Sequence, residues 1–202
     1  MTTTTLETPT TIGPPEVPFP ISADAFTLLI DKGLIPQDRR VFLWDGRLLE
    51  KMAKSKPHSA VQNMFNRALN RRLPAEFFVG NENPVQLDET HLPLPDLVVV
   101  RGDPGDFYED RYPDGRDVLL VVEVAVTSLA ADLGDRLDRY SRTLPEAVYI
   151  VADIPGRRAL IHTSPKAEGG YATCTEVGPG GSIALRLGGV DIEPIAYEEV
   201  MR

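Results

Sequence analysis

Apolar residues repeat with helical spacing in three parts of the chain, and each repeat predicts a helix that packs one face on a core. The predicted helices span residues 22–32, 55 to about 73, and 130–142. The first two begin at serines, Ser22 and Ser55, whose side chains can cap a helix N-terminus. Gly33 follows the first helix at a position where glycine commonly ends one.

Short runs of β-branched residues predict the strands of a buried sheet. They cover residues 94–100, 118–126 and 147–152, and few polar residues interrupt them, as is typical of strands covered on both faces. The helix over 130–142 connects the last two runs, which predicts a right-handed crossover between neighbouring parallel strands. The predicted fold class is therefore α/β, with a mixed central sheet flanked by helices.

Alternating or ragged patterns predict the remaining β-structure. Residues 41–52 indicate an added β-hairpin, turned by Asp45-Gly46. Residues 77–87 are polar and irregular, which favours an edge pair. Residues 158–177 alternate in the manner of a hairpin that faces solvent.

The chain has 202 residues, which suits one sizeable core. Residues 1–20 are rich in threonine and proline and predict a disordered tail before a single domain over 21–202. No run is apolar enough to span a bilayer, and the single cysteine cannot form an intrachain disulfide, so we expect a cytoplasmic protein without a membrane partner. That residue, Cys174, falls in an alternating segment and is expected to be a buried, inert thiol.

Net charge is −9 and the isoelectric point is about 4.9. This balance argues against a protein that coats nucleic acid non-specifically, because phosphate binding draws on surplus lysine and arginine. A local basic cleft remains compatible with it.

Two carboxylates stand out because they occur where a charge is costly. Glu123 interrupts the most apolar strand of the chain, and Asp96 opens another buried strand. A carboxylate in such a place must be paired or bound to a cation. Strand alternation predicts that Glu123 shares a face with Leu119, Val121 and Ala125.

If the two strands are neighbours, Asp96 and Glu123 meet at one point of the sheet. Two carboxylates with a backbone carbonyl and waters suit Mg²⁺, which can polarise a phosphoryl oxygen and activate water. The alternative is that Asp96 caps a loop and Glu123 forms a buried salt bridge with an arginine, and spacing alone favours this alternative.

An ordered series of short motifs adds to this picture. It comprises Trp44-Asp-Gly-Arg-Leu-Leu-Glu50-Lys-Met, Ser55-Lys-Pro-His58, Pro95-Asp96, Val122-Glu123-Val124, a helix with Asp132 and Arg136, and Pro145-Glu-Ala-Val-Tyr-Ile-Val. The series, from about Phe26 to the C-terminus, resembles the Uma-type family of bacterial restriction endonucleases in the PD-(D/E)XK nuclease superfamily. The resemblance implies a restriction-endonuclease-like sheet.

The resemblance implies that Asp96 and Glu123 bind Mg²⁺ or Mn²⁺ together with the backbone carbonyl of Val124. It also implies an additional acidic residue near the metal, Glu50, and a histidine at the rim, His58. The alternative for Glu50 is a solvated acid at the end of a hairpin strand. For His58 the alternative is a helix-start residue bonded to the backbone.

One departure from the superfamily pattern changes the expected chemistry. The lysine two residues after the glutamate is replaced by Ala125, and Arg136 stands where the Uma-type pattern has a lysine on the following helix. Arginine can stabilise the charge of a pentavalent phosphate but stays protonated and cannot act as a general base. The water would then be activated by the metal alone or by a second carboxylate such as Glu50.

The sequence thus predicts a Mg²⁺-dependent endonuclease acting on DNA, with Asp96, Glu123, Arg136 and Glu50 as catalytic residues. His58, Lys54, Lys56 and Arg139 are candidate nucleic-acid contacts, although a solvated helix face also accounts for such basic residues. A symmetric homodimer would supply two sites for cutting two strands. The replaced lysine and the acidic charge favour an alternative, a catalytically silent module with a binding or regulatory role. A purely structural scaffold is a third reading.

Overall fold

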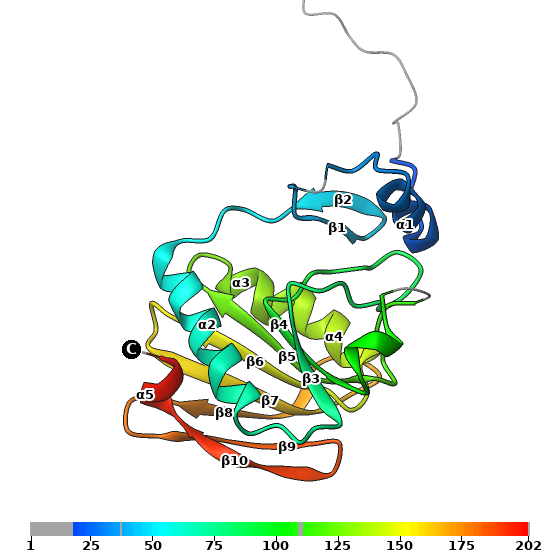
Figure 1. The fold of residues 1–202 in the computed structure, drawn as a ribbon. Coiled ribbons are helices and arrows are strands. Elements are labelled where there is room, and N and C mark those ends of the chain that lie inside the picture. Colours follow the sequence, from blue (N-terminus) through cyan, green and yellow to red (C-terminus); the bar gives the residue numbers. More distant parts are fainter. Residues whose placement is uncertain (1–17, 37, 109–110, 202) are drawn as a thin grey trace, which may run out of the picture.

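The computed structural model describes residues 18–36, 38–108 and 111–201 (Figure 1). The tail predicted over residues 1–20 lies almost wholly outside them and stays a prediction. The helical elements are α1 (Ala23–Asp31), α2 (Lys56–Asn70), the short η1 (Pro104–Asp106), α3 (Leu129–Ala131), η2 (Asp132–Arg136), α4 (Leu137–Thr143) and α5 (Tyr197–Val200). The strands are β1 (Val41–Trp44), β2 (Arg47–Glu50), β3 (Phe77–Asn81), β4 (Leu97–Arg101), β5 (Val118–Ala125), β6 (Val148–Asp153), β7 (Arg158–Pro165), β8 (Tyr171–Val177), β9 (Ser182–Leu187) and β10 (Val190–Ala196).

A six-stranded mixed sheet with the order β3-β4-β5-β6-β7-β8 forms the centre of the molecule. Strands β5 and β6 are parallel and are joined through α3, η2 and α4, whereas the other neighbouring pairs are antiparallel. All eight residues of β5 and all six of β6 are buried. The predicted mixed sheet, its buried strands and the parallel pair with a helical crossover are confirmed.

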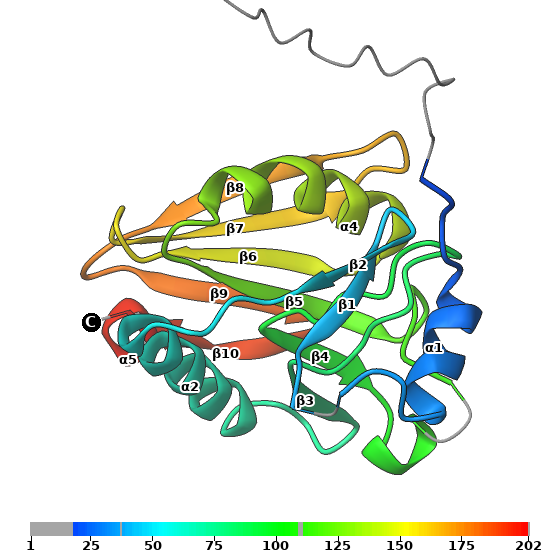
Figure 2. The same cartoon turned by 90° about the horizontal axis from the view of Figure 1, so that it is seen from above.

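Helices cover both faces of the sheet (Figure 2). On one face, apolar residues of α2 such as Phe65 and Leu69 pack on β4 and β5, together with residues of β9, β10 and α5. On the other face, Tyr140 of α4 and Leu144, just after it, pack on residues of β4, β5 and β6. This two-sided cover explains why the central strands read as continuous apolar runs.

The helix predicted over residues 130–142 is interrupted by a kink within η2. Gly134 has φ −102° and ψ −108°, which are not helical angles. Glycine tolerates this kink between two helices because it lacks a Cβ atom. The interruption leaves Asp132 and Arg136 in contact, with Nη1 of Arg136 2.9 Å from Oδ1 of Asp132.

The C-terminal part corrects two expectations and adds a hairpin that was not predicted. Strand β7 is buried over Ala159–His162 and extends the central sheet, so the hairpin predicted to face solvent does so only through β8. Cys174 is exposed rather than buried, because β8 is the edge strand. The hairpin β9–β10, which was not predicted, covers the sheet beside α2.

A β-bulge in β5 corrects a third expectation. Val99 pairs with Leu120 and Val100 pairs with Val118, so Leu119 is the extra residue of the bulge. Leu119 packs in the core with α2 and β9 rather than on the face predicted from simple alternation. Beyond the bulge the alternation holds for Val121 and Ala125, which pack on the α4 side as predicted.

The hairpin β1–β2 and helix α1 form a smaller layer beside the central sheet (Figure 1). Asp45 and Gly46 both have positive φ, 49° and 66°, as a two-residue hairpin turn requires. The backbone N–H of Gly46 donates to the carbonyl of Thr90, and Leu43 forms an isolated bridge with Leu92. These contacts fix the hairpin, and therefore the chain that follows it, against the body of the protein.

The turn can be tested by substituting Gly46→Ala and comparing it with Gly33→Ala. Both glycines have φ of +66°, but a Cβ at Gly46 would meet the Cβ of Pro20 at 2.6 Å, whereas nothing lies within 4 Å of one at Gly33. We expect Gly46→Ala to lower the free energy of unfolding by about 1–3 kcal/mol more than Gly33→Ala. If urea unfolding shows equal losses of stability in both variants, the close approach of Pro20 to Gly46 contributes nothing to the stability.

Candidate active site

Asp96 and Glu123 lie side by side because their strands are neighbours. Leu97 pairs with Val122, so Asp96, just before β4, and Glu123 of β5 lie opposite each other. The backbone N–H of Asp96 lies 3.4 Å from Oε2 of Glu123, and the backbone N–H of Val124 donates to Oδ2 of Asp96 at 2.9 Å. Both carboxylates are buried. The structure thus brings the two predicted acids together.

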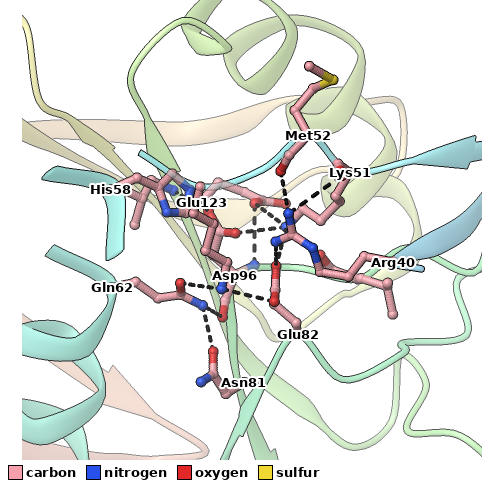
Figure 3. Close-up of polar contacts among 12 residues, drawn as sticks. Arg40, Lys51, Met52, His58, Gln62, Asn81, Glu82, Asp96 and Glu123 are labelled. Atoms are coloured by element: carbon pink, nitrogen blue, oxygen red, sulfur yellow. Dashed lines mark hydrogen bonds and ion pairs between the residues drawn. The ribbon is translucent and has the colours of Figure 1, made fainter. Parts of the chain in front are cut away.

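Two side chains from outside the sheet contact the Asp96 carboxylate (Figure 3). Nζ of Lys51, just after β2, lies 2.7 Å from Oδ1 of Asp96 and 4.0 Å from Oε2 of Glu123. Nε2 of His58, in the first turn of α2, lies 3.1 Å from Oδ2 of Asp96. The imidazole therefore points to the carboxylate rather than to the backbone, while the His58 N–H is capped by the Ser55 hydroxyl.

The other oxygen of Glu123 is held from the helical side. Oε1 accepts a hydrogen bond from the Tyr140 hydroxyl at 3.0 Å and lies 3.4 Å from Nη1 of Arg136. Arg136 also pairs with Asp132, whose second oxygen accepts from the Ser128 hydroxyl at 2.6 Å. The predicted position of Arg136 beside the site is thus observed, and so is the ion pair that the alternative reading of Glu123 required.

A third carboxylate, Glu82, lies next to the pair and is near three cationic side chains. It lies 3.0 Å from Nη1 of Arg40, 2.9 Å from Nζ of Lys54 and 3.7 Å from Nζ of Lys51. All three cations come from the segment that contains the β1–β2 hairpin, whereas Glu82 follows β3 with a positive φ of 53°. Glu82 therefore ties the hairpin segment to the edge of the sheet.

The two central carboxylates differ in their electrostatic surroundings. Burial works against ionisation of Asp96, but hydrogen bonds from His58 and Lys51 outweigh it and lower the pKa of Asp96. For Glu123 burial prevails over the attraction of Arg136 and Lys51 and raises the pKa to about 7. Neighbouring acids with pKa values pushed apart are a common feature of functional sites.

These residues line a pocket of about 380 Å³. It includes Asp96, Glu123 and Arg136, so the ion-paired carboxylates border a cleft. Two further predicted residues, Glu50 and Lys54, also line it, although the Glu50 carboxylate pairs with Nη1 of Arg39 at 2.7 Å.

The other two predicted contact residues lie elsewhere. Lys56 is exposed on the first turn of α2 and is not among the residues that line the pocket. Arg139 pairs with Asp88 at 3.2 Å and with Asp45 at 3.6 Å, on the side of the hairpin turn. The structure therefore does not bring Lys56 and Arg139 to the carboxylate pair.

Sequence reasoning did not place Lys51, Glu82 or Gln62 in contact with the carboxylate pair. Gln62 is buried in α2, where its amide donates to the carbonyl of Asp96 at 2.7 Å and accepts from Nζ of Lys54 at 2.7 Å. A buried glutamine on an otherwise apolar helix face was the signal available for it. The positions of Lys51 and Glu82 depend on how the hairpin packs on the sheet.

The donor set fits a hard divalent cation. Within residues 18–36, 38–108 and 111–201, no group of three or more His, Cys, Asp or Glu side chains is arranged to hold a metal ion. Two carboxylates nevertheless suffice for Mg²⁺, which keeps several of its waters. The ammonium of Lys51, within 4.0 Å of both acids, shows that this point attracts positive charge.

The buried mixed sheet and its carboxylate pair define a restriction-endonuclease-like α/β protein. The fold is similar to the crystal structure of a "putative nuclease belonging to DUF820" from Anabaena variabilis ATCC 29413, with a TM-score of 0.56 and 12% identity over 82% of this chain and 89% of that chain. The chain belongs to the family described as "Uma2: Putative restriction endonuclease", which matches residues 24–191. No curated protein matches the chain. Within the part of the chain that the structure describes, no helix is long and apolar enough to span a membrane.

The raised pKa of Glu123 predicts a pH-dependent stability of the metal-free protein. In the folded protein the pKa of Glu123, about 7, exceeds its ordinary value of 4.5. The stabilisation of the folded protein by neutral Glu123 is therefore fully present below pH 4.5 and is lost as pH rises through about 7. Between pH 5 and pH 8 the free energy of unfolding should fall by about 1–3 kcal/mol less in Glu123→Gln than in wild type. Urea unfolding in EDTA measures it.

The exposed Glu193 of β10 supplies the matched control for this pH series. Glu193→Gln should leave the wild-type slope of stability against pH unchanged. A wild-type slope that survives in Glu123→Gln would contradict the assignment of that slope to Glu123.

Proposed function

We propose that this protein is a metal-dependent endonuclease that hydrolyses phosphodiester bonds in DNA. The observation that carries the proposal is the Asp96–Glu123 pair, buried on adjacent strands and bordering a pocket that also contains Arg136 and Lys51. Membership of a family described as restriction endonucleases and a fold similar to that of a protein titled a nuclease support it.

Asp96 and Glu123, with the backbone carbonyl of Val124, would hold Mg²⁺ or Mn²⁺. When bound, such a metal polarises a phosphoryl oxygen and lowers the pKa of a bound water. The buried amide of Val124 fixes one oxygen of Asp96, and Tyr140 fixes one oxygen of Glu123. Each carboxylate therefore has one oxygen held by the protein and one directed to the Lys51 side, where a cation can bind.

Arg136 would stabilise the negative charge of the phosphate in the transition state. The nearby Glu123 carboxylate raises the pKa of the Arg136 guanidinium, more than burial lowers it, so the side chain remains a cation. Its planar fork can donate two hydrogen bonds to one phosphate. Arg136 is thus suited to charge stabilisation and not to proton removal. Activation of the water would fall to the metal or to Glu50, which lines the pocket.

DNA would approach along the hairpin and the first turn of α2. Lys54 lines the pocket, and His58 contacts Asp96, so both lie where a backbone phosphate can reach the carboxylate pair. Lys56 and Arg139 would contact phosphates further from the scissile bond. A cytoplasmic location and a homodimer that cuts both strands belong to the same proposal, and the single cysteine fits the former.

A second candidate function is a catalytically silent nuclease-fold module with a binding or regulatory role. The specific observation in its favour is the pairing of Glu123 with Arg136 at 3.4 Å, with Ala125 at the position of the superfamily lysine. This module would bind nucleic acid or another partner through the same pocket without hydrolysis.

The decisive test is cleavage of supercoiled DNA in Mg²⁺ or Mn²⁺ by wild type, Asp96→Asn and Glu123→Gln. We expect each substitution to lower the cleavage rate by at least about a hundredfold, because each removes a metal-binding charge. Glu193→Gln, an exposed change of the same type on β10, should cleave at the wild-type rate. A well-folded wild type that cuts neither supercoiled nor single-stranded DNA with either metal would support the silent module instead.

Arg136 provides a separate test of mechanism. Arg136→Lys keeps the positive charge beside Glu123 and should retain most of the cleavage rate, whereas Arg136→Met should lose about 10- to 1000-fold. Metal affinity, measured by calorimetry, should not fall in Arg136→Met, since Arg136 is not a ligand. Equal cleavage rates in the methionine and lysine variants would exclude a role for this charge in the transition state.

A further inference from the structure

We propose that Lys51 is the active-site lysine of this protein, delivered from the hairpin segment instead of from β5. In the metal-free protein its ammonium holds the Asp96–Glu123 pair. When a divalent cation binds this pair, Lys51 gives way and becomes the cation that faces the scissile phosphate. The second half of this inference rests on the proposed nuclease function, and the first half does not.

The contacts of Lys51 place it at the shared side of the two acids. Nζ donates to Oδ1 of Asp96 and to the carbonyl of Leu94, both at 2.7 Å, and lies 4.0 Å from Oε2 of Glu123. Only 13% of the side chain is exposed, and the residue lines the pocket. A partly buried ammonium in this position offsets the repulsion between two neighbouring carboxylates.

Lys51 and Arg136 flank Glu123 from opposite sides. Arg136 lies near Oε1, which Tyr140 also holds, whereas Lys51 lies near Oε2, the oxygen that approaches Asp96. A cation shared by both carboxylates must come to the Oε2 side. Lys51 therefore competes with a metal for the same oxygens, and Arg136 does not.

Glu82 offers the displaced ammonium a place beside the pair. Oε1 of Glu82 is already 3.7 Å from Nζ of Lys51, and Glu82 is anchored by Arg40 at 3.0 Å and by Lys54 at 2.9 Å. A small movement of the flexible lysine chain would exchange Asp96 for Glu82 as its partner. The amine would then remain in the pocket, next to the carboxylates but not between them.

A purely structural role is the alternative, because the bond from Lys51 to the Leu94 carbonyl also ties the hairpin to the sheet. The two roles predict opposite changes in metal affinity when Lys51 is replaced. A structural lysine would, on removal, loosen the site and weaken metal binding. A competing lysine would, on removal, strengthen metal binding while the metal-free protein becomes less stable.

The experiment measures Mn²⁺ binding by calorimetry, and thermal unfolding in EDTA and in saturating Mn²⁺, for wild type, Lys51→Met and Lys166→Met. Lys166 is exposed on the β7–β8 turn and controls for the loss of one positive charge. We expect Lys51→Met to bind Mn²⁺ more tightly, on the order of tenfold, since a like charge is removed beside the ligands. In EDTA, Lys51→Met should unfold at a lower temperature than wild type, and this difference should become smaller in saturating Mn²⁺. Lys166→Met should match wild type in all three measurements.

The cleavage rate tests the second half of the proposal. Lys51→Met should cut DNA at least about tenfold more slowly than wild type at saturating Mn²⁺, despite its tighter metal binding. Should Lys51→Met fail to fold, Lys51→Gln, whose amide can still donate to the Leu94 carbonyl, takes its place in every measurement.

Unchanged or weaker Mn²⁺ affinity in the folded Lys51 variant would overturn the competition, and so would the absence of Mn²⁺ binding in both wild type and variant. Unimpaired cleavage by the variant would overturn the catalytic half. If wild type binds Mn²⁺ but cuts no DNA, the nuclease function and the catalytic half both fail. The change in metal affinity then still decides whether Lys51 competes with metal.

Discussion

The burial of two carboxylates on adjacent strands is the constraint on which the rest of this structure depends. Asp96 and Glu123 lie in the most apolar part of the sheet, where uncompensated negative charge is costly. The protein compensates from two directions, with Lys51 from the hairpin segment and Arg136 from the interrupted helix. The packing of both elements on the sheet therefore serves electrostatics as well as apolar burial, and the hairpin segment becomes part of the site.

The two carboxylates are compensated unequally, and their pKa values shift in opposite directions. Asp96 receives hydrogen bonds from Lys51, His58 and the Val124 amide and favours its charged form. Glu123 is enclosed more completely, and burial outweighs its cations, so its pKa lies near neutrality. A divalent cation at this pair would remove the penalty on Glu123 that protein groups leave in place. Protein groups alone thus leave the charge of Glu123 incompletely compensated.

The central sheet could be predicted from local pattern, whereas the carboxylate pair as a site and Arg136 beside it were expected from the resemblance to a family, since spacing alone favoured a salt bridge. Glu123 is conspicuous as a charge in an apolar strand. Lys51 and Glu82 could not be found in this way, since their meeting depends on how a hairpin packs on a distant strand end. The face of Leu119 was predicted wrongly because a one-residue bulge reverses alternation without a mark in the sequence.

An acidic chain poses a problem for a nuclease, because most of its cations already have carboxylate partners. Around Glu82, the side chains of Arg40 and Lys54 are neutralised within the protein, and they add little attraction for a distant phosphate. Under the proposed function the balance would change close to the site, since a phosphate in the pocket could replace Glu82 as their partner. Affinity would then come from exchange of partners at short range rather than from steering over a long range. Such exchange favours a substrate held at the carboxylate pair over non-specific coating of nucleic acid, in keeping with a net charge of −9.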